Sequence, residues 1–151
     1  MTIEERLHED MKVALKARDK IRLDTIRMLR AQIKDRFISK KSDLTENEVE
    51  QILSTAVKRR KESIELYTRG NRNDLVAKEK AEIDIILKYL PEQLDEQEID
   101  RIIMETIKSL EVSGEKDVGR VMGDLMPKIK GKADGKIVQQ KVREALSKLT
   151  Q

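Results

Sequence analysis

The chain has 151 residues, of which 40% are charged and only 2% aromatic, with a formal net charge of +3. It contains no cysteine, which excludes disulfides, a thiol nucleophile and a zinc site built on thiolates. No apolar run approaches the ~20 residues of a membrane span, and the opening MTIEERLHED is too acidic and polar for a secretory signal peptide. We therefore expect a soluble, cytoplasmic protein with no membrane partner.

Charge is distributed unevenly along the chain. Residues 91–115 carry eight acidic and two basic side chains, whereas residues 116–151 carry four acidic and nine basic ones. Residues 1–90 are also basic overall, so an acidic belt separates two basic regions. Either basic region suits a nucleic-acid partner. The alternative is a solvated helical surface whose charges neutralise one another.

Apolar residues at helical spacing predict a first helix at 3–16 and a second at 20–38. A narrow apolar stripe on each should face the core, because the chain has few aromatic residues with which to fill one. The face of the second helix that we expect to be buried consists of Ile21, Thr25, Met28, Leu29, Ile33 and Phe37.

Two further helices complete the first part of the chain. A capping box of Thr45 and Glu48 opens the third helix, and Gly70 lies where a C′ glycine ends it. Asn73 is the predicted N-cap of the fourth helix. That helix should run to Leu90, because a following proline disfavours helical geometry.

The last third of the chain predicts three shorter helices after a linker at 90–94. Asp95 and Glu98 form a second capping box, which opens a helix at 96–110. The next helix spans about 117–126 and ends at Pro127, and Asp134 caps the last helix.

No stretch of the chain shows the alternation of a β-strand. The predicted fold class is therefore all-α, with an N-terminal four-helix domain over 1–90 and a small three-helix C-terminal domain over 91–151. The short loops indicate antiparallel neighbouring helices.

The sequence offers no catalytic residue, metal site or cofactor site. His8 is the only histidine, and it lies among acidic neighbours without a partner histidine at i+3 or i+4. Most carboxylates have a lysine or arginine at helical spacing, which is typical of solvated ion pairs. No phosphate loop, nucleophile elbow or metal motif is present. We therefore do not expect the chain to be an enzyme on its own.

Three basic clusters are candidates for binding the phosphates of a folded RNA. One runs along the second helix, one wraps around the third, and one surrounds a turn that contains Gly131 and Gly135. Their members are Arg27, Arg30 and Lys34; Lys58, Arg59, Arg60 and Lys61; and Lys128, Lys130, Lys132 and Lys136. The turn is the strongest candidate, because the amides at the start of the following helix can also hold phosphate.

The shortage of exposed aromatic side chains argues against base stacking on single-stranded RNA. We expect recognition of the backbone and shape of structured RNA instead. The alternative for each cluster is a charged helix face that keeps the protein soluble.

The segment VGRVMGDLMPKIKGKADGKIVQQKV resembles the C-terminal signature of YqeY-like proteins and the tail of the B subunit of glutamine-dependent Asp/Glu-tRNA amidotransferase. The strings LHEDMKVALKARDKIRLDTIRMLRAQIK, KRRKESIELY and ILKYLPEQL resemble the rest of YqeY. The resemblance thus covers nearly the whole chain, and it implies a helical N-terminal domain and a small helical C-terminal domain.

The resemblance also selects ten motif positions. They are Gly119, Met122, Gly123, Pro127, Lys128, Gly131, Lys132, Ala133, Asp134 and Gly135. Several are expected to be architectural. Gly119 and Gly123 lie four residues apart, which would allow close helix packing, and Pro127 would end its helix. The lysines are the members available to phosphate.

The leading hypothesis is a non-catalytic protein that binds tRNA or another structured RNA. One alternative is an accessory factor of the amidotransferase, a carbon–nitrogen ligase that takes its amide from glutamine. The resemblance does not extend to the amidase and kinase-like domains of that enzyme, so we do not expect the chain to perform the reaction unaided. The other alternative is an adaptor that docks on an acidic or translation-related protein, with the acidic belt orienting it.

Overall fold

The computed structural model describes residues 1–149, which form α-helices and one short 3-10 helix, without a strand in that range. The predicted all-α class is confirmed. The chain divides into two compact units, the first covering Met1–Pro91 and the second beginning at Glu92. Within residues 1–149, no helix is both long enough and apolar enough to cross a lipid bilayer.

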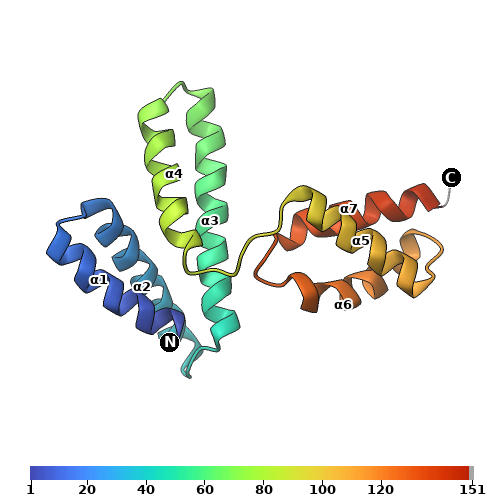
Figure 1. Ribbon diagram of the computed structural model, residues 1–151, viewed down its shortest axis with the longest axis horizontal. Helices are drawn as coiled ribbons and strands as arrows, with labels where there is room; N and C mark the ends of the chain where they lie inside the picture. Colours follow the sequence, from blue (N-terminus) through green and yellow to red (C-terminus); the bar gives the residue numbers. More distant parts are fainter. Residues whose placement is uncertain (150–151) are drawn as a thin grey trace. The chain divides into compact units, whose positions relative to one another are not determined.

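The first unit consists of two antiparallel helical hairpins (Figure 1). Its helices are α1 (Ile3–Ala17), α2 (Lys20–Lys40), α3 (Glu46–Arg69) and α4 (Asn73–Leu87). Helix α2 contacts all three of the others. The core between them is aliphatic apart from one tyrosine, and its buried members are Ile3, Leu7, Ile26, Leu29, Ile33, Val49, Leu53, Ala56, Val57, Ile83, Ile86, Tyr89 and Leu90.

The predicted buried face of α2 is wrong at both ends. Ile21 is 47% exposed and Phe37 is 46% exposed. The side chains of α2 that are buried lie between Leu23 and Ile33. Ile21 and Phe37 continue the apolar stripe into the first and last turns of the helix, where the core of the unit no longer covers it.

Helix α3 begins as predicted at Thr45, whose hydroxyl accepts the amide N–H of Glu48 at 3.1 Å. The reciprocal half of the expected capping box is absent, because the Glu48 carboxylate accepts from Lys40 Nζ at 2.7 Å instead. Gly70 is the C-cap, but its φ of −87° is an ordinary one. The left-handed residue that follows is Asn71, with φ 56°, a conformation that asparagine tolerates.

Helix α4 differs from its predicted bounds at both ends. Asn73 is its first residue and Arg72 occupies the N-cap position, without a side-chain cap. The helix ends at Leu87 rather than at Leu90. The amides of Tyr89 and Leu90 bond the carbonyls three residues earlier, so the chain tightens into turns before the proline at 91.

Tyr89 connects the segment that follows α4 to α1. Its hydroxyl donates to Asp10 Oδ2 at 2.5 Å, and Arg22 of α2 lies 3.8 Å from the same carboxylate. The guanidinium of Arg6 lies 5.0 Å from the centre of the Tyr89 ring and donates to the Lys88 carbonyl at 2.8 Å. These contacts join the two ends of the first unit's sequence.

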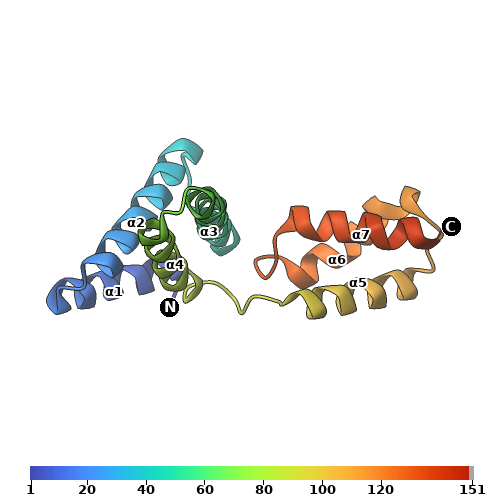
Figure 2. The same cartoon turned by 90° about the horizontal axis from the view of Figure 1, so that it is seen from above.

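The second unit contains α5 (Glu96–Leu110), the 3-10 helix η1 (Glu115–Asp117), α6 (Val118–Ile129) and α7 (Gly135–Leu149), as Figure 2 shows from above. The capping box of Asp95 and Glu98 is present as predicted. The buried core is Ile99, Ile103, Ile107, Val121, Leu125, Ile129, Val138, Val142 and Leu146.

Helix α6 continues to Ile129, so the end predicted at Pro127 is wrong. A proline near the end of a helix removes one hydrogen bond, here to the carbonyl of Gly123. Gly123 is exposed, so water can satisfy that carbonyl. Ile129 is 1% exposed, and its burial in the core favours the extra turn.

Candidate nucleic-acid interface

The strongest candidate from the sequence is the basic turn, residues 128–136, which joins α6 to α7. Its backbone is well defined: the amide of Lys130 bonds the carbonyl of Met126 at 2.9 Å, and that of Lys132 bonds Ile129 at 2.8 Å. Gly131 has φ 79°, in the region that favours glycine. The turn conformation therefore depends on Gly131.

The segment before α5 binds the carbonyl side of the basic turn. The side-chain amide of Gln93 donates to the Gly131 carbonyl at 2.8 Å, and the amide of Leu94 donates to the Lys132 carbonyl at 2.9 Å. Both bonds span more than thirty residues of sequence. They occupy the carbonyls of Gly131 and Lys132, so the lysine side chains are the groups of the turn that are suited to binding an anion.

The four lysines of the turn are not equivalent. Lys128 belongs to the last turn of α6 and lies 3.3 Å from Asp124. Lys130, Lys132 and Lys136 are exposed and form no ion pair with any residue in 1–149. Three lysines without a described ion pair are thus carried by one hydrogen-bonded turn.

The start of α7 is capped by the chain itself. Asp134 Oδ1 accepts the amide of Lys136 at 3.0 Å, as the predicted cap requires, and the Asp134 carbonyl accepts from Val138. This carboxylate occupies the Lys136 amide and adds a negative charge at the helix start. An RNA phosphate near the turn would therefore bind lysine side chains rather than the amides of α7.

Among the remaining motif positions, two glycines differ from their predicted role and others pack against the core. Gly119 and Gly123 are exposed, and a Cβ atom added at either would meet nothing within 4 Å. The expected close helix packing at these glycines is therefore wrong for the described residues. Met122 and Ala133 pack against the core of the second unit, as does Met126. Gly135 lies 3.9 Å from Met126 Cε, measured from an added Cβ.

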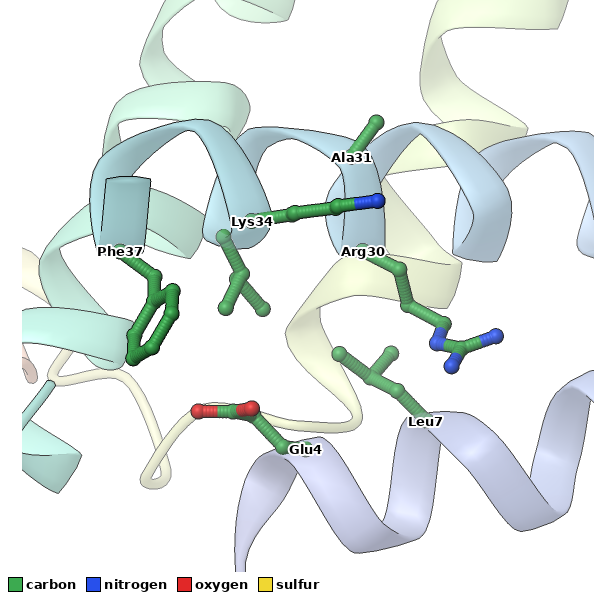
Figure 3. A pocket seen from close by; sticks show the side chains of 7 residues that line it. Glu4, Leu7, Arg30, Ala31, Lys34 and Phe37 are labelled. Carbon is green, nitrogen blue, oxygen red and sulfur yellow. The ribbon is translucent and has the colours of Figure 1, made fainter. Parts of the chain in front are cut away.

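The second cluster lies on α2 in the first unit. Arg27 and Lys34 are exposed, whereas Arg30 is half-buried with its Nη1 2.9 Å from Met11 Sδ. Arg30 and Lys34 line a cavity of about 510 Å³ between α1 and α2 (Figure 3). The other lining residues are Glu4, Leu7, Ala31, Ile33 and Phe37.

The third cluster separates into exposed and engaged members. Arg60 points into the α3–α4 interface, where its Nε lies 2.9 Å from Glu82 and its Nη1 donates to the Ala56 carbonyl at 3.0 Å. Its side chain is only 15% exposed. Lys58 is half-buried, and Arg59 and Lys61 are exposed. The exposed pair is what remains available to a partner.

His8, which the sequence assigns to the surface, is exposed on α1. Within residues 1–149 no group of three or more His, Asp or Glu side chains is placed to hold a metal ion. The exposed aromatic residue that the sequence missed is Phe37. Phe37 lies in the last turn of a helix that extends beyond the core, and this position could have indicated its exposure.

These features define an all-helical protein of two compact units, the second of which displays a basic turn. The family described as Yqey-like protein matches residues 4–146, so the chain belongs to that family. The family prediction made from the motif strings is confirmed.

Curated relatives carry the name Altered inheritance of mitochondria protein 41, mitochondrial. The one from Pyrenophora tritici-repentis is 33% identical over 144 residues, which is 93% of this chain and 79% of the relative. The one from Lachancea thermotolerans is 37% identical over 110 residues, 71% of this chain and 59% of the relative. The one from Saccharomyces cerevisiae strain S288c is 32% identical over 136 residues, which is 89% of this chain and 64% of the relative. The chain thus spans less than two thirds of the last two.

These names contradict the expected cytoplasmic location, because each relative is named as a mitochondrial protein. The expectation depended on the absence of cysteine and of apolar spans. Those features report on redox chemistry and membrane insertion, and neither distinguishes the cytosol from another reducing compartment.

Proposed function

We propose that this protein binds structured RNA, such as tRNA, and that the basic turn is its principal contact with backbone phosphates. The observation that carries the proposal is the set of three exposed lysines, Lys130, Lys132 and Lys136, around a turn of fixed conformation. Phosphate contacts of this kind position a protein on RNA without reading its sequence. Hydrogen bonds that hold the backbone of the turn lower the entropy lost on binding.

Exposed cations of the first unit are further candidate contacts to phosphate. Arg27 and Lys34 on α2, and Arg59 and Lys61 on α3, keep their charges in solvent. Arg60 contributes to the fold rather than to binding, because Glu82 already accepts from it. Lys128 is a weaker contributor than its neighbours in the turn, because Asp124 competes with phosphate for its ammonium group.

The proposal is tested by titrating the purified chain with tRNA at low and at physiological salt. The names of the relatives make a mitochondrial tRNA pool a suitable second probe. Duplex DNA of equal phosphate number is the control. Binding that prefers tRNA and survives physiological salt supports the proposal. Binding confined to low salt, and equal for DNA, would show general charge attraction and overturn it.

The site assignment is tested with K130A/K132A/K136A. Every phosphate that the variant no longer neutralises should reduce the slope of log affinity against log salt by about 0.7 to 0.9, so the triple variant should have a slope smaller by roughly two units. The matched control is K108A/K116A/K148A, which removes the same charge from exposed lysines of the same unit. Equal reductions in both variants would remove the special role of the turn.

The two protein-partner hypotheses enter the same experiments as alternative outcomes. An accessory role in an amidotransferase predicts that transamidation of tRNA changes when the chain is added to the enzyme. An adaptor role predicts a pull-down that persists after RNase treatment. Either result without tRNA binding would replace the RNA proposal.

A further inference from the structure

Phe37 is the chain's single phenylalanine and lies 46% exposed in the last turn of α2. It borders one end of the cavity between α1 and α2 (Figure 3). Behind this space α1 and α2 pack through core side chains, of which Leu7 is 0% and Ile33 is 5% exposed. The Phe37 ring is thus the accessible apolar surface of this space, in a chain with only two other aromatic residues.

The two ends of the cavity carry side chains of opposite charge. Arg30 and Lys34, on successive turns of α2, lie toward one end, where Arg30 is held against Met11. Glu4 rises from α1 toward the space between Phe37 and Leu7 (Figure 3). A ligand that fits this arrangement carries an anionic group at one end and a flat apolar body with hydrogen-bond donors at the other.

We propose, against the expectation from composition that bases do not stack on this chain, that this cavity accepts one unpaired nucleotide of a bound RNA. The base stacks on Phe37, while the phosphate lies by Arg30 and Lys34. The Glu4 carboxylate accepts an N–H from the edge of the base, and its charge keeps phosphate away from that end. Aromatic stacking with a cationic groove is how proteins bind unstacked bases.

The size of the cavity agrees with this occupant. A volume of about 510 Å³ lies within the range of roughly 300 to 1,000 Å³ found for small-molecule sites, and a single nucleotide fits such a space. An amphipathic helix needs a row of apolar contacts, and among the described residues Phe37 is the one exposed apolar side chain that borders this space with a large surface. The inference depends on the proposed RNA binding and adds to it the recognition of an unpaired base.

The first experiment compares two RNAs of equal phosphate number, a hairpin with an unpaired loop and a blunt duplex. The full chain should bind the hairpin more tightly, and F37A should weaken hairpin binding by roughly 5- to 150-fold while leaving duplex binding unchanged. The matched control is L66A, which removes another large exposed side chain, 64% accessible, from α3 of the same unit. It should leave the affinity for both RNAs unchanged.

The second experiment uses the absence of tryptophan from the chain. F37W places the chain's single tryptophan at the cavity, and L66W places it on α3 as the control; selective excitation of tryptophan avoids the two tyrosines. The hairpin should quench the fluorescence of F37W and leave that of L66W unchanged, because a stacked base quenches the indole it contacts.

Several results would overturn the inference while leaving RNA binding by the basic turn intact. These are equal binding of hairpin and duplex by the wild-type chain, an unchanged hairpin affinity in F37A, an equal loss for both RNAs in F37A, and equal quenching in F37W and L66W. Failure of the wild-type chain to bind either RNA would instead refute the proposed function, and the inference with it.

Discussion

Tyr89 is the residue at which stability and pH are most directly linked. Its side chain is 4% exposed, and burial, followed by the hydrogen bond to Asp10, raises its pKa to about 12 from an ordinary value of 10.0. The folded state therefore favours the neutral phenol. The resulting stabilisation is fully present below pH 10 and is lost as the pH rises toward 12, because the unfolded chain releases the proton first.

We expect Y89F to reduce the free energy of unfolding by about 1 to 3 kcal/mol near neutral pH, since it leaves the Asp10 carboxylate without its donor. Above pH 10 the difference between wild type and Y89F should shrink. Urea unfolding followed by far-UV circular dichroism at several pH values measures this. Y67F, which removes the other tyrosine hydroxyl, is the control. A difference that stays constant between pH 10 and 12 would contradict the role of Tyr89.

Among individual residues, local signals were predictable and long-range ones were not. Thr45, Asp95 and Asp134 cap their helices as their residue types indicate, because a cap needs only neighbouring backbone amides. The engagement of Arg60 with Glu82 joins positions twenty-two apart in sequence. Periodicity alone does not say which arginine of a basic run faces another helix.

The pairing of α3 with α4 is the element-scale feature with the clearest energetic test. Arg60 bridges the two helices through Glu82 and also lies 4.0 Å from Glu79, with all three side chains less than a fifth exposed. Removing one partner of a poorly solvated ion pair leaves the other charge uncompensated. Two carboxylates would be left in this state by the loss of Arg60.

We expect R60A to lower the free energy of unfolding by about 1 to 3 kcal/mol, a value below the range for fully buried pairs because some solvent reaches this one. R59A removes the same charge from the exposed face of the same helix, and its effect should stay within about 0.5 kcal/mol. Chemical unfolding of the two variants makes the comparison. The proposed RNA binding should be affected in the opposite order, so that R59A binds RNA more weakly than R60A does. Equal free energies of unfolding for R60A and R59A would show that Arg60 does not support the fold.

The presence of each helix could be predicted from the sequence. Several helix ends could not, because they depend on tertiary contacts that the sequence does not reveal. The 96–110 helix agrees with α5 at both ends, because a capping box opens it and a strong apolar period continues through it. Helix α6 passes Pro127 because burial of Ile129 outweighs one missing hydrogen bond. The last turns of α2 are helical without being buried, so an apolar period does not by itself locate the core.

For the whole molecule, the two units have separate cores, one formed within residues 3–90 and the other within residues 99–146. The segment between the two cores also stabilises the second unit. Gln93 and Leu94 donate hydrogen bonds to the basic turn, and Leu94 packs against the second core. The second unit is small, so each such interaction is a large fraction of its stability.

This arrangement predicts that the point at which the chain is cut matters more than the length removed. A fragment of residues 92–151 keeps both hydrogen bonds to the turn, whereas a fragment of residues 95–151 lacks them and the side chain of Leu94. The shorter fragment loses two hydrogen bonds, at about 1 kcal/mol each, and the apolar contact of the half-buried Leu94 side chain. This loss should lower the midpoint of thermal unfolding by roughly 10 °C or more in a domain of this size.

Thermal unfolding of the two fragments by circular dichroism gives the comparison, and tRNA titration shows its consequence. If these hydrogen bonds hold the turn in the conformation that displays its lysines, as we propose, the shorter fragment should also bind tRNA more weakly at a temperature where both are folded. The 92–151 fragment carrying Gln93→Ala and Leu94→Ala controls for chain length, because it loses the Gln93 hydrogen bond and the Leu94 side chain but keeps the backbone bond from Leu94 to Lys132. If the two fragments unfold at the same temperature, the linker does not support the turn, and the rigidity invoked for phosphate binding must come from Gly131 and the two helix ends alone.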